Sequence, residues 1–354
     1  MSVRPRLALT LGDAAGIGPE VVVRAWSHER LHAECKPVVV GHPDVVLRAV
    51  KLLGAKLEVV PVQSLQQGLD ASDRRRIPCW NPSSAEVGSV PLGKDDGRCG
   101  QAAYDWLVAA TRGALAGEVD AITTAPLSKG ALHLAGLKYP GHTEILAEVC
   151  GVREFGMMLY LPPTDTSAAN AVQRALSVVH VTLHTSIRSV PDLLTTDRVA
   201  EKIDLIDHFV KEVGTPQPKI GVCALNPHAG EGGLFGDEEA RIIQPAVERM
   251  RAAGRDVTGP WPADTLLKRA CAGEFDAVVA MYHDQGHIAL KLLGFHRAVN
   301  VTLGLPIVRT SPSHGTAFDI VGRGMADPNG LLEAIRVAAQ LARARPTLST
   351  VQLP

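Results

Sequence analysis

The chain has 354 residues, of which 46% are hydrophobic, 21% charged and only 4% aromatic. This composition provides for a sizeable core and excludes a disordered or low-complexity protein, and the length is typical of two domains or one large α/β unit. The 36 Lys and Arg residues balance 37 Asp and Glu residues, so no basic excess is available for phosphate-backbone binding and a dedicated nucleic-acid binder is excluded.

Short runs rich in β-branched residues alternate with longer helical patterns along the chain. This alternation predicts βαβ units and a mostly parallel sheet, and therefore an α/β fold. The predicted strands, in chain order, are Leu7–Leu11, Pro37–Gly41, Leu57–Val60, Ala121–Thr124, Met157–Leu161, Leu176–Thr182, Ile220–Leu225, Ala277–Tyr282 and Val299–Leu303. The predicted helices are Pro19–Ser27, Pro43–Leu53, Gln101–Ala116, Thr196–Val213, Asp237–Ala253 and Gly330–Ala344.

Two stretches between these elements look like surface excursions. Residues 63–96 contain the charge run Asp73-Arg74-Arg75-Arg76, which is typical of a solvated surface. Residues 162–173 read PPTDTSAANAVQ between two predicted strands, which is a long tip for a hairpin.

The cellular setting is predicted from three features. The six cysteines include no C-x-x-C pair, so neither a zinc ribbon nor a thioredoxin-type pair is indicated and free thiols in a reducing compartment are expected. The N-terminus lacks the apolar region and cleavage site of a signal peptide. No segment approaches the roughly 18 uninterrupted apolar residues of a membrane span. We therefore expect a soluble cytoplasmic protein with no membrane partner.

A glycine-rich segment, LGDAAGIGPE at residues 11–20, follows the first predicted strand and opens the first helix. Its glycines permit a tight turn, and Pro19 suits the first helical position, where its missing N–H costs nothing. The helix N-terminus could hold an anion. The G-x-x-x-G-x-G spacing differs from the Rossmann pattern, so a structural turn and a ligand loop remain equal alternatives here.

Four of the thirteen histidines are placed just beyond apolar strands, where α/β proteins build their sites: His142, His184, His228 and His283. Histidine at a strand end is a common way to build a metal site with open positions. The wide separation of these histidines carries no local ligand signature. Metal ligation and ordinary hydrogen bonding therefore both remain open from spacing alone.

Seven segments resemble the 4-hydroxythreonine-4-phosphate dehydrogenase family, in consistent order over about residues 7–340. They are GDAAGIGPE, TAPLSKGALHLAG, YPGHTE, LNPHAGEGGLFGDEE, GPWPADT, YHDQGHIALK and AVNVTLGLPIVRTSPSHGTAFDIVGRGMADP. The stretch HGTAFDIVGRGMADP also resembles the nucleotide-binding loop of isocitrate and isopropylmalate dehydrogenases.

The resemblance implies an isocitrate/isopropylmalate dehydrogenase-like fold, with two α/β/α lobes around a cleft. We expect lobe one, with the nucleotide loop, over 1–140 plus 305–354, and lobe two, with the metal and the dimer interface, over 141–304. The resemblance also implies an obligate homodimer whose active site is shared, so that a monomer would lack a complete site.

The resemblance further implies a set of site residues. It places one divalent metal (Zn, Co, Mn, Ni or Mg) on His184, His228 and His283; His180 competes with His184, which is preferred because Arg188 follows it at the family's spacing. The implied substrate residues are His142, Thr143, Lys291, Asn300 and Arg309, which suit a phosphate; surface solvation is the alternative for Lys291 and Arg309. NAD or NADP is implied at Asn226, Gly315, Thr316 and Asp319, although Gly322 and Gly324 could simply end a strand. The implied catalytic residues are Asp264, Asp284 and Lys291.

The implied chemistry is metal-assisted oxidation of a secondary alcohol by NAD, followed by loss of carbon dioxide where the new carbonyl lies β to a carboxylate. The family includes branches acting on 4-phosphohydroxy-L-threonine, on threonate or erythronate 4-phosphate, and on the cis-dihydrodiol of terephthalate. HVTLH at 180–184 and GHI at 286–288 resemble the second and third branches, and YPGHTE at 139–144 the second. A P-loop phosphotransferase is excluded because GxxxxGK[ST] is absent, and a non-catalytic paralogue would need lost site residues.

Overall fold

The computed structural model describes residues 4–163, 175–294 and 296–345. The chain divides into two compact units: unit 1 comprises Met1–Arg153 and Leu305–Pro354, and unit 2 comprises Glu154–Gly304. Helix α7 (His142–Cys150) packs on α5 (Gly97–Leu115) of unit 1. Because of this packing His142 and Thr143 belong to unit 1, whereas the predicted division at residue 140 placed them in the second lobe.

The unit 1 sheet is fully parallel and has the order β3-β4-β2-β1-β5-β12. Its strands are β1 (Arg6–Thr10), β2 (Lys36–Val40), β3 (Glu58–Val62), β4 (Arg76–Trp80), β5 (Ala121–Thr124) and β12 (Arg309–Pro312). The central strands β1, β2 and β5 are buried almost throughout, as expected for a parallel sheet covered on both faces.

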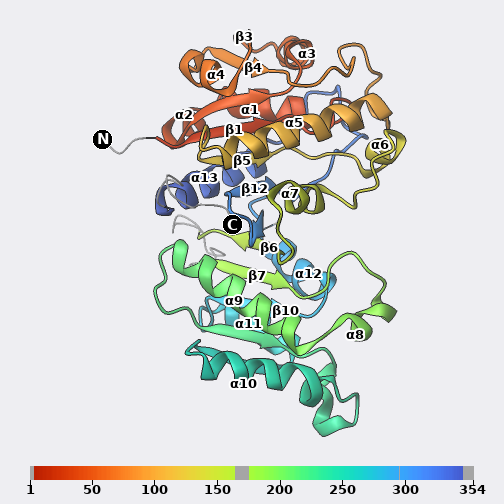
Figure 1. The fold of residues 1–354 in the computed structure, drawn as a ribbon, viewed down its shortest axis with the longest axis vertical. Helices are drawn as coiled ribbons and strands as arrows, with labels where there is room; N and C mark the ends of the chain where they lie inside the picture. Colours follow the sequence, from red (N-terminus) through yellow and green to blue (C-terminus); the bar gives the residue numbers. More distant parts are fainter. Residues whose placement is uncertain (1–3, 164–174, 295, 346–354) are drawn as a thin grey trace. The chain divides into compact units, whose positions relative to one another are not determined.

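Helices cover this sheet on both faces (Figure 1). On one face α1 (Gly18–Trp26) packs against α3 (Pro43–Leu53) and α13 (Asn329–Ala344), and α2 (Glu29–Glu34) packs against α13. On the other face α6 (Lys129–Leu134) and α7 pack against α5, and α4 (Leu65–Ala71) packs against β4 and β2. Pro19 lies in the first turn of α1, as predicted. Gly12 has a φ of 65°, and a Cβ there would lie 2.2 Å from the Pro126 carbonyl oxygen, so the turn before α1 requires glycine.

The unit 2 sheet has the order β11-β6-β7-β10-β8-β9. Its strands are β6 (Gly156–Leu161), β7 (Leu176–His180), β8 (Ile220–Cys223), β9 (Val257–Trp261), β10 (Ala277–Ala280) and β11 (Val299–Leu303). β7, β10, β8 and β9 are parallel, whereas β6 runs antiparallel to both of its neighbours. The carboxyl ends of β7, β10 and β8 therefore meet at one edge of the sheet.

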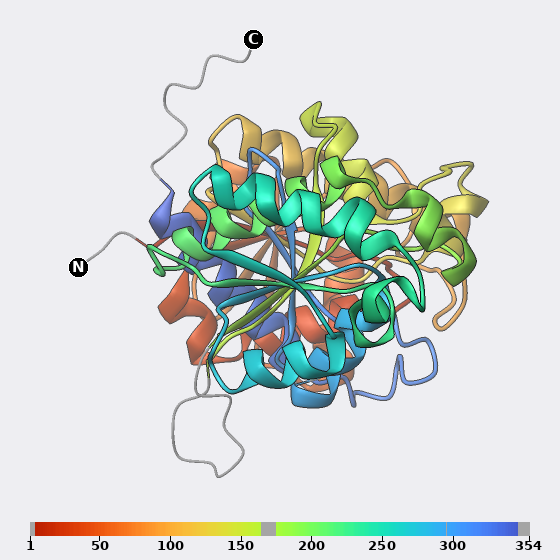
Figure 2. The same cartoon turned by 90° about the horizontal axis from the view of Figure 1, so that it is seen from below.

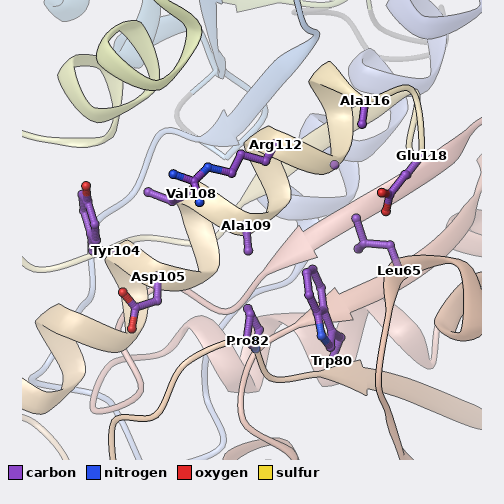
Figure 3. A pocket seen from close by; sticks show the side chains of 11 residues that line it. Leu65, Trp80, Pro82, Tyr104, Asp105, Val108, Ala109, Arg112, Ala116 and Glu118 are labelled. Carbon is purple, nitrogen blue, oxygen red and sulfur yellow. The ribbon is translucent and has the colours of Figure 1, made fainter.

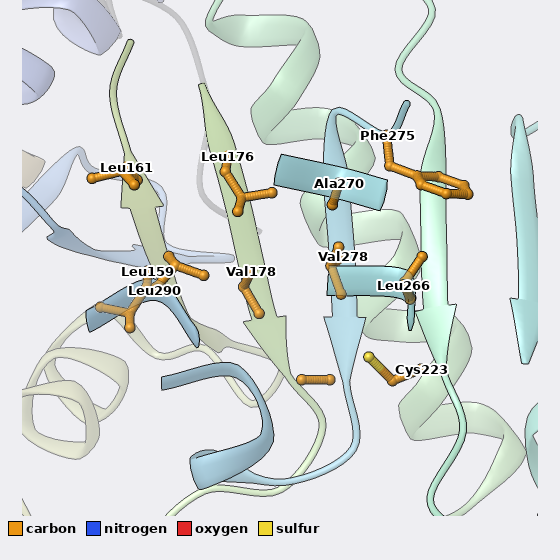
Figure 4. Close-up of a cluster of buried hydrophobic side chains, with 11 residues drawn as sticks. Leu159, Leu161, Leu176, Val178, Cys223, Leu266, Ala270, Phe275, Val278 and Leu290 are labelled. Carbon is orange, nitrogen blue, oxygen red and sulfur yellow. The ribbon is translucent and has the colours of Figure 1, made fainter. Parts of the chain in front are cut away.

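The helices of unit 2 lie on both faces of its sheet, with α9 and α10 on one side and α11 and α12 on the other (Figure 2). Their bounds, with those of the short helical turns, are η1 (Ile187–Ser189), α8 (Val190–Leu193), α9 (Thr196–Glu212), η2 (Pro227–Gly233), η3 (Glu239–Ile243), α10 (Gln244–Ala252), α11 (Ala263–Cys271) and α12 (His283–Gly294). Figure 4 shows the apolar core under α11 and α12, where Val178, Val278 and Leu290 are fully buried.

The predicted elements are present, and the structure adds several that were not predicted. The expectation of a surface excursion over 63–96 is wrong, because α4 and β4 lie there and Ile77 and Cys79 of β4 are fully buried. The charge run that leads into β4 is on the surface, as predicted, with Arg74, Arg75 and Arg76 exposed. The predicted hairpin tip at 162–173 lies almost wholly outside the described residues.

Two further findings concern the thiols and the helices. All six cysteines are free thiols, and four of them, Cys35, Cys79, Cys99 and Cys223, are buried. Within the described ranges, no helix combines the length and the apolar character that crossing a bilayer requires.

Candidate functional site

A pocket of about 400 Å³ opens in unit 2 where β7 and β10 end. These strands are parallel neighbours, and Ala280 pairs with His180. Because both strands end at the same edge of the sheet, the segments that follow them come together. The pocket is lined by Leu183, His184, Thr185, Ser186, Ile187, Val190, Tyr282, His283 and Asp284. Two of the three histidines predicted as metal ligands therefore lie on its wall.

His283 begins α12, and its tautomer is determined by its neighbour Asp284. The Nδ1 of His283 lies 2.7 Å from a carboxylate oxygen of Asp284. A carboxylate accepts, so Nδ1 carries the proton and Nε2 keeps its lone pair. The His283 and His184 ring centroids are 5.6 Å apart. Two imidazoles sharing one metal at about 2.0–2.1 Å place their centroids about 5–6 Å apart. The donor chemistry and the spacing of this pair both fit a divalent metal.

The third predicted ligand, His228, lies in the loop after β8 on an unusual stretch of backbone. His228, Ala229, Gly230, Glu231 and Gly232 all have positive φ, from 45° to 79°, and form a turn of left-handed helix. Left-handed backbone costs roughly 1–2 kcal/mol for each residue other than glycine. His228 Nδ1 lies 3.2 Å from a Glu231 carboxylate oxygen, and the His228 side chain is 73% exposed. Strain of this kind concentrates at functional sites.

Within one chain the three predicted ligands are not brought together. Among the residues that the structure describes, no group of three or more His, Cys, Asp or Glu side chains could hold a metal. One chain therefore contributes the His184 and His283 pair at the pocket, and His228 separately on its exposed loop.

The segment that enters the left-handed turn is held by Glu239, a residue that the sequence reasoning did not single out. Glu239 is 6% exposed, and its carboxylate accepts from the backbone N–H groups of Leu225 and Asn226 at 2.8 Å each. The Asn226 side-chain amide donates to both Glu238 and Glu239. Asn226, predicted as a cofactor residue, thus uses its amide hydrogens to tie this loop to the start of η3.

His180 does not line the pocket, although it competed with His184 for the role of ligand. His180 is fully buried at the end of β7, and both of its ring nitrogens have protein partners, the Met157 carbonyl oxygen and His287. Burial lowers the pKa of His180 to about 4 and the pKa of His287 to about 2. The two rings are therefore neutral at physiological pH.

The other predicted unit 2 residues are spread over several elements. Asp264 is exposed in the first turn of α11, and Asn300 lies in β11 opposite Leu159 of β6. Lys291 follows His283 and His287 at four-residue steps along α12, and its charge contributes to the lowered pKa of His287. His283, His287 and Lys291 therefore share one face of that helix.

Unit 1 holds a buried cationic site built from β5, β12 and α7. Arg309 is 4% exposed and donates from Nη2 to the Thr124 hydroxyl at 2.6 Å. Burial lowers the pKa of Arg309 to about 9, so the guanidinium stays charged at neutral pH. Burial, and then the charge of Arg309, lower the pKa of His142 well below its usual value. His142 begins α7, so the expectation that it directly follows a strand is wrong; Thr143 comes next and is buried.

The segment predicted to bind the nucleotide is anchored to the start of α1. The Ile17 N–H donates to the Thr316 carbonyl at 3.0 Å, and Glu20 accepts from the Gly322 N–H at 2.7 Å. Gly315 and Asp319 are exposed, and a Cβ at Gly315 would meet nothing within 4 Å. Gly322 and Gly324 have φ values of 78° and 61° and follow no strand, so the alternative that they end one is wrong.

A second pocket, of about 600 Å³, lies on unit 1 between α5 and β4 (Figure 3). Trp80 and Pro82 form its floor, and Tyr104 and Arg112 project from α5. None of the residues predicted to act in substrate, cofactor or metal binding lines this pocket.

Comparison with known proteins agrees with the predicted resemblance. The family model described as pyridoxal phosphate biosynthetic protein PdxA matches residues 33–338. The chain is 44% identical over 343 residues to D-threonate 4-phosphate dehydrogenase of Cupriavidus necator, covering 96% of this chain and 98% of that protein.

Two solved structures show the fold. The 4-hydroxythreonine-4-phosphate dehydrogenase of Klebsiella pneumoniae matches with a TM-score of 0.83 and 42% identity, over 96% of this chain and 99% of that chain. The terephthalate 1,2-cis-dihydrodioldehydrogenase of Burkholderia xenovorans LB400 matches with a TM-score of 0.62 and 31% identity, over 95% and 98%. The chain therefore belongs to the family of pyridoxal phosphate biosynthetic protein PdxA, the 4-hydroxythreonine-4-phosphate dehydrogenase family.

Proposed function

We propose that the protein is an NAD- and divalent-metal-dependent dehydrogenase that oxidises and decarboxylates a phosphorylated 3-hydroxy acid, with threonate 4-phosphate as the first candidate. Erythronate 4-phosphate and 4-phosphohydroxy-L-threonine belong to the same substrate class. The observation that carries the proposal is the buried guanidinium of Arg309 beside Thr124 and His142. The 44% identical relative named D-threonate 4-phosphate dehydrogenase supports the order of the candidates.

The phosphate assignment follows from the charge of the unit 1 site. Placing a cation in a protein interior is costly, and an anion offsets that cost best when it also receives hydrogen bonds. Arg309 supplies a fixed cation, and Thr143 lies in the first turn of α7, where backbone N–H groups favour an anion. The lowered pKa of His142 keeps its ring neutral, so it can donate one hydrogen bond without adding charge. Lys291 and Asn300 of unit 2 are further substrate residues in this proposal.

His184, His283 and His228 are the residues that would hold the metal. A bound divalent ion supplies Lewis acidity, which lowers the pKa of a substrate hydroxyl and stabilises negative charge on its oxygen. Asp284 keeps the proton on Nδ1 of His283, as Glu231 does for His228, so that each ring presents Nε2. Neutral imidazoles accept Zn, Co, Mn or Ni readily and Mg less well.

The proposed reaction has two chemical steps. The C3 hydroxyl would lose its proton to a base of this chain, and bound NAD would supply the oxidant that takes the hydride from C3, which leaves a ketone. The C1–C2 bond then breaks, carbon dioxide leaves, and C2 takes a proton to give a three-carbon hydroxyketone phosphate. Asp284, Asp264 and Lys291 are the candidates for accepting and returning these protons.

The nucleotide is assigned to the segment at 314–324, with Gly315, Thr316 and Asp319 as its contacts and Asn226 as a further cofactor residue. The open space beside Gly315 and the anchoring of this segment on α1 support the assignment. The choice between NAD and NADP is part of the assay below.

We also propose a homodimer that shares the active site. Unit 2 exposes large apolar side chains next to the pocket and along α12: Ile187 at 68%, Ile288 at 57% and Leu292 at 83%. Exposed apolar surface of this kind is typical of subunit contacts. A second copy would bring its own His228 to the His184 and His283 pair, since one chain does not bring the three together. The free thiols favour a cytoplasmic setting.

A second candidate is an aromatic cis-dihydrodiol dehydrogenase. The 31% identity to the terephthalate dihydrodiol enzyme favours it, but such a substrate carries no phosphate and makes less use of Arg309.

The test is an assay of the purified protein with NAD or NADP and one divalent metal at a time, following absorbance at 340 nm. The substrates are threonate 4-phosphate, erythronate 4-phosphate, 4-phosphohydroxy-L-threonine and the terephthalate dihydrodiol. We expect metal-dependent NADH formation with a phosphorylated acid and release of one carbon dioxide per NADH. Turnover of the dihydrodiol alone would transfer the assignment to the second candidate.

A further inference from the structure

Two buried histidines that the proposed reaction does not use form a hydrogen-bonded pair behind the unit 2 pocket. His180 ends β7 and is 0% exposed, and His287 lies in the second turn of α12 and is 6% exposed. Nδ1 of His287 lies 3.1 Å from Nε2 of His180, and Nδ1 of His180 lies 3.3 Å from the Met157 carbonyl oxygen.

The Met157 carbonyl sets the direction of both hydrogen bonds. A carbonyl can only accept, so His180 must carry its proton on Nδ1 and accept at Nε2. His287 must then donate from its own Nδ1. Each imidazole is thereby restricted to one tautomer. The Met157 carbonyl of β6 determines the tautomer of His180, and His180 in turn determines that of His287.

Gly286 makes this close approach possible. A Cβ at Gly286 would lie 2.5 Å from His180 Nε2 and 2.7 Å from Val178 Cγ1. Any larger residue would push α12 away from β7 and separate the pair. The contact between the two histidines therefore depends on where β7 ends, on the glycine at position 286 of α12 and on the histidine that follows this glycine.

The pair is connected to the pocket through His283. The rings of His287 and His283 are stacked, with centroids 3.7 Å apart and planes 12° apart. His283 lines the pocket and is held at Nδ1 by Asp284. One face of the His283 ring is thus fixed by His287, and one edge by Asp284.

We propose that His180 and His287 are positioning residues, which hold the His283 imidazole in the plane that presents Nε2 to a metal. The inference rests on the proposed function, in which His283 is a metal ligand. An apolar side chain of similar size at 180 or 287 would fill the space without fixing the ring. Partners outside the ligand set that orient a metal-binding imidazole typically contribute 10- to 100-fold in metal affinity.

The test measures Co²⁺ binding to the full-length protein, because the visible absorption of Co²⁺ responds to ligand number and geometry. We expect His180→Leu and His287→Leu each to weaken Co²⁺ binding by 10- to 100-fold in competition with a chromophoric chelator, and to change the visible spectrum. The double variant should lose little more than either single variant, since the two residues act as one unit.

Three further variants make the result specific. His287→Asn keeps a donor towards His180 but lacks the stacked ring, so it should fold and still bind Co²⁺ weakly. Gly286→Ala should weaken binding in the same way by separating the pair. His32→Leu is the matched control: His32 is a buried histidine bonded to the Trp26 carbonyl, and its loss should lower Tm without changing Co²⁺ affinity.

The outcomes separate the inference from the function on which it rests. Wild-type Co²⁺ affinity and spectrum in His287→Leu and His287→Asn, with Tm lowered no more than in His32→Leu, would show that the pair only packs, and would overturn the positioning role alone. Absence of Co²⁺ binding by the wild-type protein would overturn the metal assignment itself, and the positioning role with it.

Discussion

Arg309 combines burial with charge in a way that makes its replacement informative. Its Nη2 donates to Thr124 at 2.6 Å, and its charge adds to the effect of burial in lowering the pKa of the neighbouring His142. A hydrogen bond to a charged group contributes about 1.5–3 kcal/mol, which corresponds to one or two powers of ten in rate. We therefore expect Arg309→Lys to reduce kcat/KM for a phosphorylated acid by roughly 10- to 100-fold, because Lys lacks the planar guanidinium.

Steady-state kinetics check this prediction, with Arg112→Gln as the control. Arg112 is an exposed arginine on α5 of the same unit, and its loss should leave kcat/KM unchanged. Equal losses of activity in the two variants would remove Arg309 from the phosphate site.

Asp13 makes stability depend on pH in a predictable direction. It is 0% exposed, and burial raises the pKa of its carboxyl to about 6, from 3.8. Below pH 4 both the folded and the unfolded chain are protonated here. Between pH 4 and 6 only the folded chain keeps the proton, so stability is lost as the pH rises through this window. Above pH 6 the penalty is constant at roughly 3 kcal/mol.

Asp13→Asn should remove this contribution. Unfolding by urea at pH 4.5 and pH 7.5 measures it: the wild-type protein should lose more free energy of unfolding between the two pH values than the variant does. Parallel pH dependence in both proteins would show that Asp13 is already ionised in the folded state at pH 4.5.

At the scale of the elements, the turn after β8 depends on Glu239. Its buried carboxylate accepts three hydrogen bonds, from the Leu225 and Asn226 N–H groups and from the Asn226 amide. Glu239→Ala should lower the free energy of unfolding by roughly 2–3 kcal/mol and expose residues 227–236 to proteolysis. Limited proteolysis with mass analysis of the fragments checks the second effect.

Ala229→Gly is the matched change in the same turn. Ala229 has a φ of 56°, which glycine adopts without steric cost, so this variant should be no less stable than the wild-type protein and equally resistant to protease. A stable Glu239→Ala variant with an uncut loop would mean that the turn holds its shape without Glu239.

The elements that could be predicted from the sequence are those with apolar runs or helical periodicity. Ala121–Thr124, Val299–Leu303 and Pro43–Leu53 are predicted to the residue. β4, β9 and β12 were not predicted because none contains a continuous apolar run: proline interrupts RIPCW, Gly-Pro interrupts VTGPW, and RTSP has no apolar pattern. Their strand conformation comes from pairing with neighbours that only the folded chain supplies.

The same limit applies to the site. Histidines that follow strands could be predicted, because parallel strands bring their ends together, and His184, His228 and His283 do follow β7, β8 and β10. The contact of His180 with His287 joins segments 107 residues apart in the chain, and the hydrogen bonds of Glu239 reach back across the whole turn to Leu225 and Asn226. No local sequence pattern predicts such contacts. The glycine at 286 is consistent with a close approach of α12 to His180, because a Cβ there would lie 2.5 Å from His180 Nε2.

At the scale of the whole molecule, the exposed apolar residues of α12 test the proposed dimer. Leu292 is 83% exposed, and a charge there would have to be buried in any interface that uses this helix. We expect the wild-type protein to be a dimer by size-exclusion chromatography with light scattering, and Leu292→Glu to shift it towards monomer with loss of activity. Leu134→Glu, at a 65% exposed leucine of unit 1, should leave the dimer intact. A fully active Leu292→Glu monomer would contradict a shared site.

The path of the chain through the two units has a consequence for how the protein is made. Unit 2 is contained between the two segments of unit 1, so a ribosome delivers all of unit 2 before it delivers β12 and α13. β12 pairs with β5, and α13 packs over both strands. Until they emerge, β5 presents an open parallel edge, which is a template for wrong pairing. Unit 2 can therefore begin to fold on the nascent chain while unit 1, although begun earlier, still lacks β12 and α13. Chains released at residue 304 would contain every strand and helix of unit 2 and an aggregation-prone unit 1.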